Sequence, residues 1–259
     1  MNIEFNLNFT SLLNNISPIN MKHLPNFITS LNLTSGFIAI IFAANGNIVT
    51  ASWLVLAAMI FDFLDGFSAR ILKAYSSIGK EFDSLADVVS FGVAPGLIIY
   101  HLLNKSILSN GPIDINSDGL KATLLMLVSA IMPVCAALRL AIFNLDSTQA
   151  TTFKGLPTPA NALAVISVVI AGHYSQSPLF NSFTGSPFLL VLFTIILSLL
   201  MVSRIPLLSL KISNLKLKGN EGRYILLGLV LIGFVIFGPT AIPLIIPLYI
   251  ISSAISLLF

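Results

Sequence analysis

The sequence predicts an all-α membrane protein with several transmembrane helices, and three observations support this fold class. Hydrophobic residues make up 56% of the 259 residues, whereas charged residues make up only 9%. The mean hydropathy of +0.96 excludes an ordinary soluble domain. Apolar runs of about 20 residues, the length that crosses a bilayer as a helix, recur along the chain. The short alternating segments of a membrane β-barrel are not found, so we expect a polytopic transmembrane helical bundle.

Turn-forming residues divide the apolar sequence into about eight expected spans. The breaks fall at Asn45-Gly46-Asn47, Gly111-Pro112, Gly155-Leu156-Pro157, Gly185-Ser186-Pro187 and Gly238-Pro239. The spans are residues 27–44, 48–70, 82–104, 119–144, 159–175, 186–203, 223–238 and 240–258. The last two are short, and Pro243 and Pro247 interrupt the eighth, because proline removes a helical hydrogen bond.

We expect one membrane domain in four consecutive parts. These are an N-terminal segment (1–24), a six-helix core (25–203), a basic cytoplasmic loop (204–222) and two additional C-terminal spans (223–259). The N-terminal segment either lies on the membrane surface or is disordered. The basic loop either contacts anionic headgroups or follows the usual positive-inside bias.

The lysines and arginines predict which side of the membrane each loop occupies. With the N-terminus inside, eleven of the 13 basic residues are cytoplasmic, and only Lys105 and Lys121 lie outside. We therefore expect an inner-membrane protein with both termini in the cytoplasm. The basic residues are spread over several loops, so the net charge of +3 does not indicate a nucleic-acid partner.

Four aspartates gather in an otherwise apolar stretch, where each charge is costly unless it has a function. Asp62 and Asp65 are three residues apart and share one helix face, as do Asp83 and Asp87, four residues apart. We expect the turn between the two helices around residues 75–79. Two antiparallel helices joined by this turn would direct all four carboxylates into one cavity at the cytoplasmic face.

Four unpaired carboxylates repel one another, and one or two divalent cations would relieve that repulsion. Oxygen ligands favour hard ions, so we expect Mg²⁺ or Mn²⁺. The absence of histidine and cysteine from residues 62–87 argues against zinc. Cations held in this way commonly act on phosphates and can polarise a diphosphate.

The residues around the aspartates also suit a nucleotide diphosphate. Arg70 can hold a phosphate through two hydrogen bonds. Gly66 and Ala69 are small enough to let a nucleotide approach the helix backbone, and Gly79 opens the third helix, whose N-terminus attracts anions.

Two other interpretations of the cluster remain open from these residues alone. A buried ion-pair network could hold the helices together, although only Arg70 and Lys80 are available to neutralise four acids. An ion-coupled transporter could use the acids to bind its coupling ion. Their position near one membrane face, rather than at the bilayer midplane, weighs against a transporter.

The full pattern D-x-x-D-G-x-x-A-R-x8-G-x-x-x-D-x-x-x-D resembles the signature of the CDP-alcohol phosphatidyltransferases. Its fixed positions are Asp62, Asp65, Gly66, Ala69, Arg70, Gly79, Asp83 and Asp87. The resemblance extends over the first six expected spans, which correspond to the common core of that family. It implies an enzyme in which an alcohol displaces CMP from a CDP-linked lipid.

The resemblance also implies a role for each residue of the site. Asp62, Asp65 and Asp83 would be metal ligands, and Asp87 would be both a shared ligand and the base that accepts the proton of the alcohol. The residues expected to bind the CDP-lipid are Gly66, Ala69, Arg70, Ser76, Gly79, Asn26 and Thr29.

Four stretches resemble the bacterial and archaeal branch of this family that uses serine as the acceptor. They are Pro25-Asn26-Phe-Ile-Thr29 with Asn32, Asp83-Ser-Leu-Ala-Asp87-Val-Val-Ser-Phe-Gly-Val-Ala-Pro95, Leu138-Arg139-Leu-Ala-Ile-Phe-Asn144 and Phe153-Lys-Gly155-Leu-Pro157-Thr-Pro159. The resemblance implies CDP-diacylglycerol and L-serine as substrates and phosphatidylserine and CMP as products. Ile142 departs from the pattern, because this branch usually carries a second arginine there.

The serine-binding candidates are Arg139, Asn144 and Lys154. Arg139 would bind the carboxylate of serine or the lipid diphosphate, or would only anchor its helix at the membrane face. Asn144 would hold the ammonium group of serine or cap the end of its helix. Glycerol 3-phosphate or an inositol phosphate is the rival acceptor. Such an acceptor carries a phosphate and needs two or three extra basic residues near the site, and only Arg139, Lys154 and Lys80 are available. By analogy with related enzymes we also expect a homodimer surrounded by membrane lipid.

Overall fold

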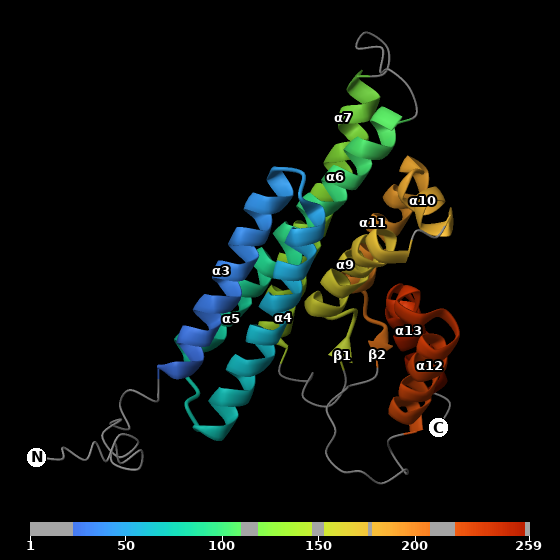
Figure 1. The fold of residues 1–259 in the computed structure, drawn as a ribbon. Helices are drawn as coiled ribbons and strands as arrows, with labels where there is room; N and C mark the ends of the chain where they lie inside the picture. The colour runs from blue at the N-terminus through green and yellow to red at the C-terminus, as the bar shows by residue number, and fades with distance from the viewer. Residues whose placement is uncertain (1–22, 110–118, 147–152, 176–177, 208–220, 257–259) are drawn as a thin grey trace, which may run out of the picture.

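The computed structural model describes residues 23–109, 119–146, 153–175, 178–207 and 221–256. Its first part contains the helices α3 (Leu24–Ala44), α4 (Ile48–Ile71), α5 (Ser77–Asp87), η1 (Val88–Val93), α6 (Ala94–Ser109), α7 (Gly119–Leu127), η2 (Val128–Ala130) and α8 (Ile131–Leu145). The second part contains β1 (Phe153–Lys154), α9 (Thr158–Ser175), α10 (Pro178–Thr184), α11 (Pro187–Val202), β2 (Pro206–Leu207), α12 (Glu221–Phe237), η4 (Gly238–Leu244) and α13 (Ile245–Ser256). Figure 1 shows these helices as one bundle.

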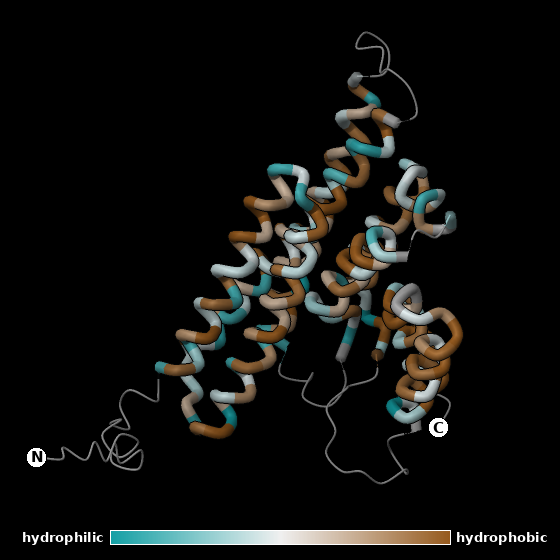
Figure 2. Tube along the Cα trace, in the orientation of Figure 1, coloured by the Kyte–Doolittle hydropathy of each residue, from teal (hydrophilic) through white to brown (hydrophobic). Residues whose placement is uncertain are grey.

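The helical membrane architecture agrees with the sequence prediction. Among the described residues, four helical segments are long and apolar enough to cross a membrane: Leu24–Ala44, Ile48–Ile71, Ser77–Leu108 and Gly119–Leu145. The shorter apolar helices are Thr158–Tyr174, Pro187–Val202, Gly222–Phe237 and Ala241–Ser253. Figure 2 shows apolar residues along much of these helices. The count of eight spans stays a prediction, because a full crossing takes about 20 helical residues.

The N-terminal helices α3 and α4 form an antiparallel pair joined by the predicted turn at Asn45-Gly46-Asn47. Gly46 has a φ of +79°, a left-handed conformation that glycine adopts without steric cost. The side chain of Asn47 caps α4 by accepting a hydrogen bond from the backbone N–H of Thr50. Buried alanines such as Ala39 and Ala58 let the two helices pack closely.

The turn between α4 and α5 lies slightly earlier than predicted. Helix α4 ends at Ile71, and the hydroxyl of Ser76 accepts a hydrogen bond from the N–H of Gly79 at 2.9 Å. This cap starts α5 at Ser77, so Gly79 sits inside the first turn instead of opening the helix. The chain reverses at Lys73, which has a φ of 49°.

A π-helical turn interrupts the third span directly after the last aspartate. The sequence predicted a regular helix over residues 82–104, whereas η1 follows Asp87 and extends to Val93. Such turns carry one extra residue and are frequent at functional sites. The turn places the hydroxyl of Ser90 3.1 Å from the carbonyl oxygen of Asn32 on α3. Gly36 permits this approach, because a Cβ there would lie 2.8 Å from the Cα of Ser90.

A short antiparallel ladder joins the loop after α8 to the loop after α11. Strand β1 pairs with β2, so that Lys154 lies opposite Pro206. Gly155 extends the contact by donating its backbone N–H to the carbonyl of Ile205 at 2.9 Å. A side chain at Gly155 would lie 2.6 Å from the carbonyl oxygen of Met201, so only glycine fits. The ladder was not predicted, because two residues carry no detectable alternation.

The C-terminal part departs from two regular spans. Gly238 follows α12 with a φ of +58°, and η4 and α13 share the last expected span between them. Pro243 lies inside η4, in agreement with the predicted interruption. The seven-residue helix α10 was not predicted either.

Candidate active site

Three of the four aspartates meet at the junction of α4 and α5. Asp62 comes from α4, and Asp83 and Asp87 come from consecutive turns of α5. One carboxylate oxygen from each lies within 4.8 Å of the other two. The spacing of the residues along two antiparallel helices produces this cluster, as the sequence predicted.

The fourth aspartate, Asp65, points toward another helix. Its side chain is buried, and its Oδ2 accepts a hydrogen bond of 2.7 Å from the hydroxyl of Thr29 on α3. It still lies within electrostatic range of Asp62, Asp83 and Asp87. Thr29, a predicted contact of the CDP-lipid, therefore positions Asp65 in this structure.

Asn32 belongs to the site, although the resemblance included this residue without giving it a role. Its Nδ2 donates a hydrogen bond of 3.2 Å to Oδ1 of Asp87. The residue is fully buried, and its own Oδ1 has no hydrogen-bond partner among the described residues. The signal was present in the sequence, because Asn32 lies three residues after Thr29 and so shares its helix face.

The chemistry of this cluster fits a divalent cation. Among the described residues, no lysine or arginine forms an ion pair with any of the four aspartates. Oδ1 of Asp83 is buried and lacks a hydrogen-bond partner in the same part of the chain. Buried carboxylates are normally paired or bound to metal, and an all-oxygen donor set suits Mg²⁺ or Mn²⁺. The residues present therefore fit the expected cofactor without identifying the ion.

Several predicted CDP-lipid contacts lie around the start of α5. A Cβ on Gly79 would lie 2.9 Å from both Oδ1 of Asn26 and the hydroxyl oxygen of Ser76, so the absence of a side chain at Gly79 lets these three residues pack together. Arg70 donates from Nε to the carbonyl of Gly66 at 3.0 Å, and its side chain is exposed.

Ala69 is half-buried on the same helix and contributes to the turn after α4. Its carbonyl accepts a hydrogen bond of 3.0 Å from the N–H of Ala74. The predicted CDP-lipid residues thus come from three helices, α3, α4 and α5.

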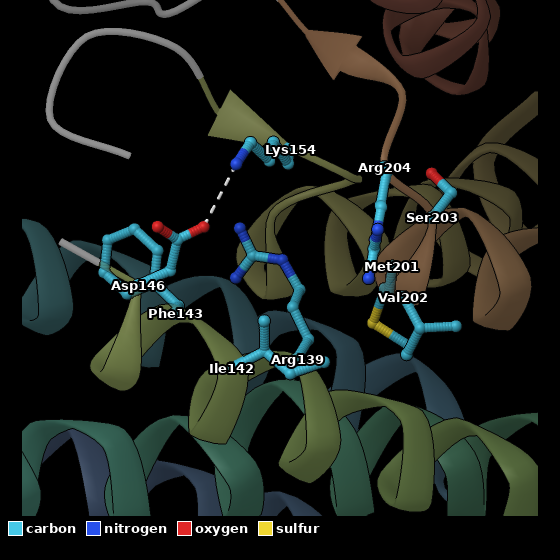
Figure 3. Close-up of a pocket in the computed structure, with 9 residues that line it drawn as sticks. All are labelled: Arg139, Ile142, Phe143, Asp146, Lys154, Met201, Val202, Ser203 and Arg204. Atoms are coloured by element: carbon cyan, nitrogen blue, oxygen red, sulfur yellow. Dashed lines mark hydrogen bonds and ion pairs between the residues drawn. The ribbon is translucent and has the colours of Figure 1, made fainter. Parts of the chain in front are cut away.

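A polar cavity of about 420 Å³ lies between α8, the β1–β2 ladder and the end of α11. Its lining residues are Arg139, Ile142, Phe143, Asp146, Lys154, Met201, Val202, Ser203 and Arg204. Figure 3 shows the guanidinium of Arg139 extending into this space from α8. The side chain is mostly buried, its Nε has no hydrogen-bond partner among the described residues, and its Cζ lies 5.9 Å from the ring centre of Phe143.

Arg139 also interacts electrostatically with residues outside the polar cavity. It lies within electrostatic range of Asp87 in the carboxylate cluster and of Tyr249 on α13.

Charged side chains of both signs face the polar cavity. Nζ of Lys154 forms an ion pair of 3.2 Å with Oδ2 of Asp146 (Figure 3). The side chain of Arg204 lines the same cavity from the side next to β2, across from Lys154 and Asp146 (Figure 3). The sequence assigned Arg204 to the basic loop, and no local pattern linked it to Lys154, because the β1–β2 ladder joins segments about 50 residues apart.

Asn144 does not line the polar cavity with the other two serine-binding candidates. Its Nδ2 donates to the hydroxyl of Ser84 at 3.0 Å and to a carboxylate oxygen of Glu81 at 3.4 Å, and both partners lie on α5. The alternative that Asn144 caps its own helix is wrong, because α8 continues to Leu145 and the capping position is Asp146. The side chain instead links α8 to the helix of the carboxylate cluster.

We predict that Asn32→Ala lowers the turnover of the enzyme about 10- to 100-fold, the usual cost of losing a side chain that orients a metal-binding group. Its loss frees Asp87 to rotate away from the cluster. Thr34→Ala is the matched control, because this exposed hydroxyl bonds only to its own helix, at the carbonyl of Ser30. Steady-state kinetics of the two variants measure the turnover of each. Equal turnover in Asn32→Ala and Thr34→Ala would contradict the prediction.

Comparison with known proteins confirms the resemblance seen in the motif. The CDP-alcohol phosphatidyltransferase family profile matches residues 22–206. A CDP-diacylglycerol–serine O-phosphatidyltransferase of Helicobacter pylori is 35% identical over 249 residues, which cover 93% of this chain and 94% of that protein. A protein of the same name from Bacillus subtilis is 33% identical, covering 71% of this chain and 89% of its own length.

A relative from an archaeon is named for a different lipid product. The archaetidylserine synthase of Methanothermobacter thermautotrophicus is 34% identical over 155 residues, which cover 59% of this chain and 60% of that protein. The matched family region contains all four aspartates, Arg139, Lys154 and Arg204. This chain belongs to the CDP-alcohol phosphatidyltransferase family.

Proposed function

We propose that the protein transfers the phosphatidyl group of CDP-diacylglycerol to the hydroxyl of L-serine, releasing CMP. The family supplies the reaction type, and the names of the relatives above supply the acceptor. The observation that carries the choice of serine is the polar cavity, which contains charges of both signs and includes Arg139, a residue within electrostatic range of Asp87.

Serine is a zwitterion and needs both signs of charge near its backbone groups. Arg139 and Arg204 suit its carboxylate, because a guanidinium can donate two parallel hydrogen bonds. Asp146 suits its ammonium group, with Lys154 holding this carboxylate in place by the ion pair of 3.2 Å. Asn144 plays an indirect part by tying α8 to α5.

The reaction requires one bond to form and one to break at the phosphorus atom. The serine oxygen attacks the phosphorus that carries the diacylglycerol, and the bond from that phosphorus to the CMP oxygen breaks. Asp87 receives the hydroxyl proton, held in position by Asn32 through the hydrogen bond of 3.2 Å. A divalent cation bound to Asp62, Asp83 and Asp87, with Asp65 beside them, would neutralise the diphosphate and acidify the hydroxyl.

The CDP moiety is expected along the start of α5. Asn26, Ser76 and Gly79 would surround part of it, and Arg70 would rotate from the Gly66 carbonyl to hold a phosphate. The bundle arrangement and the positive-inside bias favour an active site at the cytoplasmic face of the inner membrane. We keep a homodimer and cytoplasmic termini as part of the same proposal.

We predict that removing divalent cations with a chelator abolishes transfer and that Mg²⁺ or Mn²⁺ restores it. Binding can be measured without turnover by electron paramagnetic resonance of added Mn²⁺. The double variant Asp62→Asn/Asp83→Asn should lose bound Mn²⁺, because two of the three clustered carboxylates are then neutral. Mn²⁺ binding equal to that of the unaltered protein would rule out this cluster as the metal site.

A phosphate-bearing acceptor is the second candidate, and one observation favours it. Arg139, Lys154 and Arg204 bring three basic side chains to the cavity, with Arg204 in the place for which the sequence had suggested Lys80. Such a set can bind the phosphate of glycerol 3-phosphate or of an inositol phosphate. Asp146 weighs against that choice, because a carboxylate in the cavity repels a dianion.

A direct assay separates the acceptors. Purified protein with labelled CDP-diacylglycerol and Mg²⁺ or Mn²⁺ is supplied with serine, glycerol 3-phosphate, an inositol phosphate or water. We expect a labelled lipid product and released CMP with serine. A lipid product with another acceptor, and none with serine, would overturn the proposal. CMP release that requires an alcohol also excludes a transporter.

A further inference from the structure

A second cavity lies between the family core and the C-terminal helices. It has a volume of about 860 Å³, is lined by residues of α9, α10, α11, α12, η4 and α13, and is open on one side. Every lining residue is an alanine, valine, leucine, isoleucine, phenylalanine or proline. Part of its wall lies beyond residue 206, where the match to the family ends, so the C-terminal helices create it.

The apolar cavity reaches from the core to the outer surface of the bundle. Its inner wall includes Ala164 and Leu197, each with only 4% of its surface exposed. Its rim includes Phe237 and Ile251, which are 55% and 50% exposed. The opening is therefore on the apolar surface that faces lipid in a membrane-spanning bundle.

The lining excludes the common alternatives to a hydrocarbon occupant. Water needs two to four polar partners in a buried site, and these side chains provide none. An empty cavity of this size would leave its walls without contacts, at a large cost in stability. A second protein would need a protruding apolar segment to reach the inner wall at Ala164 and Leu197. Acyl chains, by contrast, surround the opening at high concentration.

The cavity has the dimensions of part of a lipid. Along α11 its wall runs from Phe193 to Leu200, which is roughly 10 Å at 1.5 Å per residue. Leu200 lies near the C-terminal end of α11 and is followed by Met201, which lines the polar cavity. The apolar cavity therefore extends toward the end of α11 that carries the polar cavity, and a lipid with its chain in this place would have its headgroup toward that end.

We propose that this cavity binds an acyl chain of a resident membrane phospholipid, which fills the space between the family core and the C-terminal helices. The lipid comes from the leaflet that borders the active site. It acts as a packing element for α12 and α13 and is distinct from the reacting lipid. The proposal is independent of the acceptor, because it rests on a cavity outside the catalytic cluster.

Native mass spectrometry of the purified protein tests this proposal directly. Val168→Phe fills the cavity, because Val168 lines it and is only 6% exposed. Leu199→Phe is the matched control on α11, since Leu199 is 58% exposed and lies outside the lining. We expect the unaltered protein and the control to retain a phospholipid that Val168→Phe loses. Equal retention in all three proteins would overturn the proposal.

Thermal unfolding provides a second measurement. Added dioleoylphosphatidylglycerol should raise the Tm of the unaltered protein and of Leu199→Phe, but not that of Val168→Phe. If Val168→Phe fails to fold, the smaller change Ala164→Leu replaces it in both experiments. A lipid-dependent rise in the Tm of a filled variant would contradict the assignment.

The same variants distinguish a resident lipid from the chain of the substrate. The KM for CDP-diacylglycerol is measured with dioleoyl and dioctanoyl chains. A resident lipid predicts that filling the cavity leaves the ratio of the two values unchanged. A rise in KM confined to the dioleoyl substrate would show that the reacting lipid occupies the cavity, and it would overturn the proposal.

Discussion

Asp87→Asn is expected to abolish phosphatidyl transfer while leaving part of the divalent-cation binding intact. The amide cannot accept the proton of the alcohol, and loss of a general base typically lowers turnover by about 10²- to 10⁴-fold. Asp62 and Asp83 remain as ligands, because their carboxylates still meet within the cluster. Release of CMP from CDP-diacylglycerol measures turnover, and Mn²⁺ resonance measures binding.

Glu81→Gln is the control for this experiment. Glu81 lies on the same helix, two residues before Asp83, and its side chain is exposed. Glu81→Gln removes one negative charge outside the cluster and keeps an oxygen that can accept the hydrogen bond from Asn144, so it should leave turnover close to that of the unaltered protein. Near-normal turnover of Asp87→Asn would show that another group accepts the proton. Complete loss of Mn²⁺ binding would show that Asp87 acts chiefly as a ligand.

Arg139→Ala is expected to raise the KM for serine about 10- to 100-fold, the effect of losing a charged hydrogen bond worth about 1.5–3 kcal/mol. The maximal rate should change much less, because the interaction with the carboxylate exists before and during the reaction. Arg139→Lys should give an intermediate KM, since an ammonium keeps the charge but loses the two-point geometry. Initial rates over a range of serine concentrations measure both constants.

Lys105→Ala provides the charge-matched control for Arg139→Ala. Lys105 is exposed near the end of α6, far along the chain from both cavities. The KM of Lys105→Ala for serine should equal that of the unaltered protein. If Arg139→Ala also leaves this KM unchanged, Arg139 serves to anchor α8 at the membrane face. A rise in the KM for CDP-diacylglycerol alone would assign it to the lipid diphosphate.

Local sequence patterns were sufficient for the carboxylate cluster. Asp62 projects toward Asp83 and Asp87 because residues three or four apart share a helix face and a short turn makes the helices antiparallel. The same reasoning placed Asp65 with them, but the structure turns its side chain to Thr29. That choice depends on how α3 packs against α4, which no spacing within α4 can predict.

Of the breaks in the helices, one could be predicted from the sequence and another could not. The Asn45-Gly46-Asn47 turn was predictable, because asparagine and glycine favour a helix cap and a left-handed backbone. The π-helical turn after Asp87 was not, because the local sequence Val88–Val93 carries no specific signal for an extra residue in a helix. It accompanies the contact between Ser90 and Gly36, which are far apart in the sequence.

The membrane class, the helical fold, the carboxylate cluster and the family can be predicted from the sequence, because they depend on apolar run lengths and on spacings within single helices. Three contacts become visible only in the folded bundle: Asn32 holds Asp87, Asn144 bonds to side chains of α5, and Arg204 meets Lys154 and Arg139 at one cavity. Each of these contacts joins segments distant in the sequence. Their geometry follows from the packing between helices and from the pairing of β1 with β2. No pattern within a single helix or loop encodes either of these.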